Sequence, residues 1–90
     1  MITILQFDPF ESISEFKFCM DCCGGEVEFR WHGKDYACTH MQDGSMCISE
    51  ANRQETALFS SDIEEILDYL IDGQKLREII KDVEVLFRLI

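Results

Sequence analysis

Apolar residues in the first quarter of the chain recur at the spacing of one helical face. They fall three or four positions apart, at Phe10, Ile13, Phe16 and Met20. Asp8 and Pro9 are typical of a helix start, and the Gly24-Gly25 pair is typical of the residues that follow a helix. The pattern therefore predicts a helix from about Pro9 to Cys22.

From Glu26 onward the apolar positions alternate with polar ones, which is the period of a half-buried strand. The predicted strands are Glu26–His32, Asp35–His40, Ser45–Ala51 and a weaker one from about Glu55 to Phe59. A tight turn at His32-Gly33 and a three-residue loop over residues 42–44 would pair the first three antiparallel. This loop length puts Met46 and Ile48 on the same face as Tyr36 and Cys38.

Helical spacing returns after Ser61, where Ser61 and Glu64 fit a capping box. Two short helices are predicted, separated by Asp72-Gly73. Their buried stripes are Ile63, Ile66, Leu67 and Leu70 for one, and Leu76, Ile79, Ile80 and Val83 for the other. The tail Glu84–Ile90 fits a helix or a strand, and its valines favour the strand.

These elements predict a single compact α+β domain over residues 1–90. An N-terminal helix packs on a three- to four-stranded antiparallel sheet, and two short helices follow. The chain has no apolar run of the roughly 18 residues that would span a bilayer, and no basic residue precedes its short apolar start. We therefore expect a soluble, cytoplasmic protein.

The chain is strongly acidic, with 18 Asp and Glu against 8 Lys and Arg and a formal net charge of −10. Such a charge repels phosphate backbones and anionic membranes, and it favours basic protein surfaces as partners. Between Gln54 and Gln74 there are six acids and no Lys or Arg. An alternative is that the acidity only keeps a small protein in solution.

Five cysteines are present, three of them crowded at the end of the first predicted helix. The strand register places Cys38 opposite Val27 and His40 opposite Gly25, so the helix end should lie near both. Structural zinc takes four thiolate or imidazole ligands. The predicted set is Cys19, Cys22, Cys38 and His40, with Cys23 and Cys47 as possible replacements.

Two other interpretations of the cysteines remain open. Cysteine behaves as a small apolar residue, and Cys38 could simply pack in the core. The other is redox catalysis by Cys19 and Cys22. Catalytic cysteine pairs favour the start of a helix, whereas this pair lies at the end of a helix among acidic residues. No motif for catalysis or phosphate binding is present, so we expect a protein that is not an enzyme.

In size, charge and α+β layout the chain resembles the type II anti-CRISPR proteins, small acidic inhibitors carried by phages and mobile elements. The segments GGEVEFRWHGKDYACTH and DYLIDGQKLREII also resemble small proteins of Gram-positive bacteria and their phages. The first resemblance implies a mechanism, in the cytosol of the host bacterium, in which an acidic surface occupies a basic nucleic-acid channel of an RNA-guided nuclease or grips a lobe of that nuclease. Guide or target DNA loading would then be blocked. Neither resemblance assigns a residue.

We therefore predict a protein-binding inhibitor that does not itself bind nucleic acid or membrane. Its contact residues would be exposed carboxylates, namely Glu28, Glu64, Glu65 and Asp68. Two alternatives share part of this evidence. A nuclease immunity protein would use the same attraction of acid for base, and a zinc-stabilised adaptor would bind through an apolar patch instead.

Overall fold

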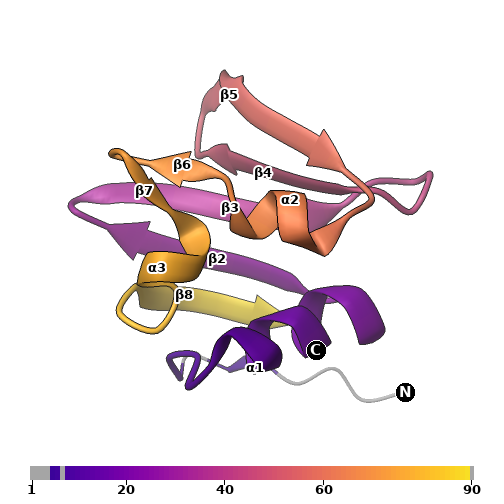
Figure 1. The fold of residues 1–90 in the computed structure, drawn as a ribbon, viewed down its shortest axis with the longest axis horizontal. Coiled ribbons are helices and arrows are strands. Elements are labelled where there is room, and N and C mark those ends of the chain that lie inside the picture. Colours follow the sequence, from indigo (N-terminus) through magenta and orange to yellow (C-terminus); the bar gives the residue numbers. More distant parts are fainter. Residues whose placement is uncertain (1–4, 7, 90) are drawn as a thin grey trace.

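The computed structural model describes residues 5–6 and 8–89, and it shows an α+β fold built on one antiparallel sheet (Figure 1). In spatial order the strands are β1 (Leu5–Gln6), β8 (Glu84–Leu89), β2 (Glu26–Trp31), β3 (Lys34–His40), β4 (Met46–Glu50) and β5 (Arg53–Ser60). The last strand of the chain thus lies beside the first long one, and the sheet has more strands than the sequence pattern predicts.

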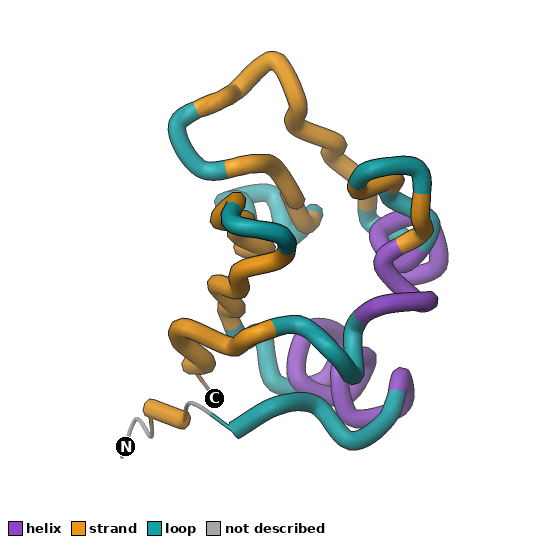
Figure 2. The backbone as a smooth tube through the Cα atoms, turned by 90° about the vertical axis from the view of Figure 1, so that its left-hand side faces the viewer, coloured by secondary structure: helices purple, strands orange, loops and turns teal. Residues whose placement is uncertain are grey.

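The other elements all lie on one face of this sheet (Figures 1 and 2). They are α1 (Ile13–Lys17), the π-helical turn η1 (Phe18–Cys22), α2 (Ile63–Leu67), the hairpin β6 (Leu70–Ile71) and β7 (Gln74–Lys75), and α3 (Leu76–Ile79). None of the helices in the described ranges is long and apolar enough to cross a membrane. The opposite face of the sheet, called the outer face below, carries no helix.

The predicted register of the central strands is confirmed. Phe29 pairs with Tyr36, and Val27 pairs with Cys38. The turn residues His32 and Gly33 have φ values of 52° and 79°, as a tight hairpin turn requires. The loop over residues 42–44 has the predicted length, because His40 pairs with Met46.

The first helix is shorter than predicted. Ser12 forms the N-cap, accepting a hydrogen bond at 3.1 Å from the backbone N–H of Glu15, so α1 begins at Ile13 rather than at Pro9. Phe10 is buried without being helical and packs edge-on against Phe16, with ring centroids 5.3 Å apart. Phe10 is therefore buried as its spacing predicts, although the segment that carries it is not helical.

The predicted second helix also ends early. Ile63, Ile66 and Leu67 are buried as expected, but Leu70 is 63% exposed and belongs to the β6–β7 hairpin. Asp72 and Gly73 form the turn of that hairpin, with φ values of 51° and 83°. An Asp-Gly pair strongly favours this turn, and it outweighs the helical spacing of the preceding residues.

The tail forms the favoured strand, β8, and Ile90 lies outside the described residues. The pairing of β8 with β2 shifts between Glu28 and Phe29, which face Phe87 and Val85 respectively. This irregularity leaves one extra residue on β8 and turns Arg88 to the inner face, opposite Val27. Arg88 is only 4% exposed, and it is the one charged side chain buried among the described residues.

Candidate functional site

The five thiols fall into two groups. Cys19 and Cys38 are buried in the core, at 2% and 0% exposure, whereas Cys22 and Cys23 are exposed and Cys47 is half-buried. Across residues 5–6 and 8–89, no group of three or more His, Cys, Asp or Glu side chains is placed to hold a metal ion. The four predicted ligands are therefore not gathered at one point, and zinc binding stays a prediction.

The buried thiols behave as core groups. Burial raises the pKa of Cys38 to about 12 and also raises the pKa of Cys19, although the nearby Arg88 guanidinium opposes the second shift. Both are neutral thiols at physiological pH. These two positions therefore agree with the apolar interpretation of the cysteines.

The end of the first helix lies near the end of β3, as predicted. The backbone of Gly25 connects the two. His40 donates from Nδ1 to the carbonyl oxygen of Gly25 at 3.0 Å, because that oxygen can only accept. The Gly25 N–H in turn donates to the carbonyl oxygen of Cys19 at 2.9 Å. One glycine thus ties the end of η1 to β3.

Three of the predicted contact carboxylates have internal partners, two of them in ion pairs and one in a hydrogen bond. Glu64 lies 2.9 Å from Lys17 and 3.0 Å from Arg77, and these hydrogen bonds lower the pKa of Glu64. Asp68 lies 2.8 Å from Arg77. Glu65 accepts a hydrogen bond from the Ser60 hydroxyl at 3.0 Å.

Sequence reasoning did not find these ion pairs because their basic partners come from other segments. Lys17 belongs to α1, while Arg77 belongs to α3. Asp68 is the C-cap residue of α2. Reversing the charges of Glu64, Glu65 and Asp68 together would therefore remove internal ion pairs as well as surface charge. Whether Glu64, Glu65 and Asp68 contact a partner remains a prediction.

The ion pairs of the described residues show which charged side chains are free to contact a partner. Seven of the eight Lys and Arg side chains are ion-paired, and they lie against seven of the 18 acids. Among the residues described, the other eleven acids have no Lys or Arg within 4.0 Å. The basic groups are therefore occupied internally, whereas most of the acids are not.

Several of these eleven acids lie around β8. Glu26 and Glu28 are on the neighbouring strand β2, Glu84 is on β8 itself, and Asp82 is in the turn that leads into it. The backbone carbonyl of Asp8 accepts a hydrogen bond from Arg88 at 3.1 Å, which places Asp8 beside β8 on the inner side of the sheet. Of the predicted contact residues, Glu28 alone belongs to this group.

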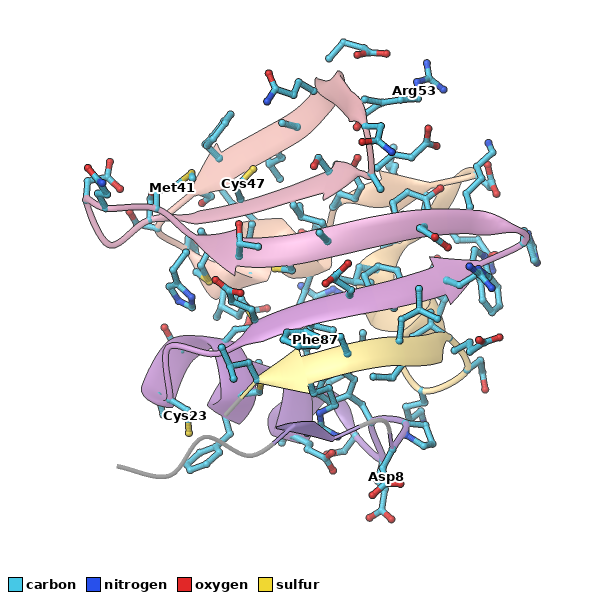
Figure 3. The ribbon with its side chains drawn as sticks, turned by 180° about the vertical axis from the view of Figure 1, so that it is seen from behind. Asp8, Cys23, Met41, Cys47, Arg53 and Phe87 are labelled. Atoms are coloured by element: carbon cyan, nitrogen blue, oxygen red, sulfur yellow. The ribbon has the colours of Figure 1, made fainter. Side chains whose placement is uncertain are left out.

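No helix of the described residues covers the outer face of the sheet (Figure 3). On this face Phe87 lies opposite Glu28, and Cys47 lies between Thr39 and Phe59. Phe59 is 61% exposed, while the others are half-buried apart from the exposed Glu28. The sequence predicted that Glu28 is exposed, but it did not identify Phe59 or Phe87 as surface residues.

No protein-family model matches this chain, and neither a curated protein nor a solved structure matches it. The α+β class of the fold is therefore defined by the strand order and helix placement described above.

Proposed function

We propose that this protein is a non-catalytic inhibitor that binds a basic surface of a nucleic-acid enzyme, in particular an RNA-guided nuclease. The observation that carries the proposal is the distribution of charge. Seven of eight basic side chains are neutralised within the fold, while eleven carboxylates among the described residues have no basic partner. The acids are thus available to a basic partner.

The proposed mechanism is competition for phosphate-binding side chains. Lys and Arg that line a nucleic-acid channel hold phosphates, and carboxylates can pair with the same groups. Glu28 and Glu26 would make such contacts from β2, where neither has a Lys or Arg within 4.0 Å among the described residues. Association driven in this way is fast and weakens as salt increases.

The carboxylates of α2 have a smaller part in this proposal than the sequence predicted. Glu64 and Asp68 would have to leave Lys17 and Arg77 before they could pair with a partner. The proposed contact therefore centres on β2 and its neighbours rather than on α2.

A cleavage assay tests the proposal. The protein is titrated into a panel of purified type II RNA-guided nucleases, before and after guide loading, and cleavage of target DNA is followed at two salt concentrations. We expect cleavage to fall stoichiometrically for at least one nuclease, with a weaker effect at high salt. Undiminished cleavage by every nuclease at a large molar excess would reject the proposed target class.

A further inference from the structure

The outer face of the sheet is organised as two rows of side chains that run across the strands. The first row contains Phe87, Glu28, Ala37 and Ser49. The second contains Leu89 and Glu26 on β8 and β2, followed by Thr39, Cys47 and Phe59 on the next three strands. Together the rows hold apolar or small side chains around two carboxylates, and neither row contains a basic residue.

We propose that these two rows form a docking surface for a basic amphipathic segment of the partner protein. Such a segment presents Lys or Arg beside apolar side chains. The basic groups would pair with Glu26 and Glu28, while the apolar groups would cover Phe59 and Phe87. This inference rests on the proposed function, because the partner that supplies the segment is the inhibited nuclease.

The charge of the surface argues against a second copy of the chain as its occupant. A symmetric dimer places the same patch on both subunits, so the acidic patch that contains Glu26 and Glu28 would face a second acidic patch. No Lys or Arg lies within either row to offset that repulsion. Arg30, also on the outer face of β2, is already held by Asp35 through a contact of 2.7 Å.

The edge of the sheet is less suited to binding than its face. Strand addition needs unpaired backbone groups along a regular edge. In β5 the pairing with β4 is irregular between Arg53 and Leu58, where the Thr56 hydroxyl accepts from the Glu50 N–H at 2.9 Å. The backbone carbonyl of Thr56 also accepts from the Tyr69 hydroxyl at 2.8 Å. Part of this edge is therefore already occupied.

Two exposed apolar residues provide a matched test. Phe59 lies on the outer face at 61% exposure, and Leu70 lies on the hairpin at 63% exposure. We expect Phe59→Ser to raise the Kd for the inhibited nuclease about tenfold or more, because the aromatic ring would be buried on binding. Leu70→Ser should change the Kd less than about twofold. Equal Kd values for both variants and the wild type would overturn the docking surface while leaving the inhibitory function standing.

A second measurement locates the surface without the nuclease. A synthetic helical peptide with one Lys face and one Leu face is added to the isotope-labelled protein, and amide chemical shifts are recorded. We expect the largest shifts at Glu28, Ala37, Cys47 and Phe59, and smaller shifts when Glu replaces Lys in the peptide. Shifts confined to residues 63–68, or no shifts at all, would reject the surface. Shifts on the outer face combined with no nuclease inhibition would reject only the proposed function.

Discussion

Arg88 and Glu15 form an ion pair of 2.9 Å that joins the last strand to the first helix. The Arg88 guanidinium also lies 4.0 Å above the ring centre of Phe10 and donates to the backbone carbonyl of Asp8. Because Arg88 is buried, these contacts replace part of the water that its charge would otherwise require, while its Nε has no hydrogen-bond partner among the described residues. They explain why an arginine is accommodated on the inner face of the sheet, and they fix the segment before α1.

The first prediction concerns this buried arginine. Arg88→Met should lower the free energy of unfolding by about 2–4 kcal/mol, because it removes the ion pair, the aromatic contact and the bond to Asp8 together. Glu15→Gln should cost less, since Arg88 keeps its other two contacts. Urea unfolding of the two variants measures the difference. If Arg88→Met were as stable as the wild type, Arg88 would not hold these elements together.

The second prediction concerns Gly25, which lies where η1, β3 and β8 meet. A Cβ at this position would meet the backbone carbonyl oxygen of Leu89, and it would lie 2.9 Å from the sulfur of Cys19. Gly25→Ala should therefore destabilise the fold by about 3 kcal/mol or more, since a backbone atom cannot move aside cheaply. Thermal unfolding measures the loss.

Gly24 supplies the matched control for this substitution. Its φ is 61°, and a Cβ there would have no atom within 4 Å. Asn tolerates the left-handed conformation, so Gly24→Asn should change the melting temperature little. Equal losses for the two variants would show that the contact with β8 does not explain the effect of Gly25→Ala.

The third prediction is a loss of stability at high pH. The Cys38 thiol has a pKa of about 12 in the folded protein and an ordinary value of 9.0 when unfolded. Between these values the unfolded chain releases this proton and the folded chain keeps it. The stabilisation is therefore complete below pH 9 and is lost as the pH rises toward 12, by up to about 1.4 kcal/mol per pH unit.

Cys38→Ala should flatten this pH dependence, which urea unfolding at pH 8 to 11 can measure. Some slope should remain, because burial also raises the pKa values of Cys19, Cys47 and Tyr36. An identical slope in the variant and the wild type would show that Cys38 does not contribute to it.

The fourth prediction concerns thiol reactivity and bears on zinc. In the native protein, iodoacetamide should modify Cys22 and Cys23 rapidly, whereas Cys19 and Cys38 should react only after denaturation. Mass spectrometry of the labelled peptides gives the pattern. Rapid labelling of Cys38 in the folded protein would contradict its place in the core.

Zinc added before labelling tests the predicted metal site. If Cys19, Cys22, Cys38 and His40 hold the ion, zinc should protect Cys22 and raise the melting temperature, because metal binding is coupled to folding. If neither changes and the purified protein contains no metal, the predicted zinc site is wrong.

Local signals in the sequence predicted the central part of the fold. The alternating pattern and the turn at His32-Gly33 determined the pairing of Val27 with Cys38, and the loop before Ser45 determined the next pairing. Such short-range features depend on neighbouring residues. The favoured strand in the tail was confirmed, but its place beside β2 depends on contacts that no local pattern encodes.

The candidate site was less accessible to sequence reasoning because it depends on distant residues. The run of acids on α2 suggested an open negative surface, yet Lys17 and Arg77 come from elsewhere to pair with Glu64. Likewise, the irregular pairing of β8 turns Phe87 to the outer face and Arg88 to the inner one. Periodicity alone cannot predict where one extra residue interrupts a strand pair.

A competition experiment tests most directly whether this protein occupies the basic surface of the nuclease that otherwise binds nucleic acid. Binding of labelled guide RNA to a nuclease that the protein inhibits is measured as the protein is added. We expect the wild type to displace the RNA and a Glu26→Gln, Glu28→Gln double variant to do so several-fold less well. A Gln54→Lys, Glu55→Gln variant changes the net charge equally on β5 and should behave like the wild type. Equal displacement by all three proteins would contradict the proposed contact of Glu26 and Glu28 with the surface that binds nucleic acid.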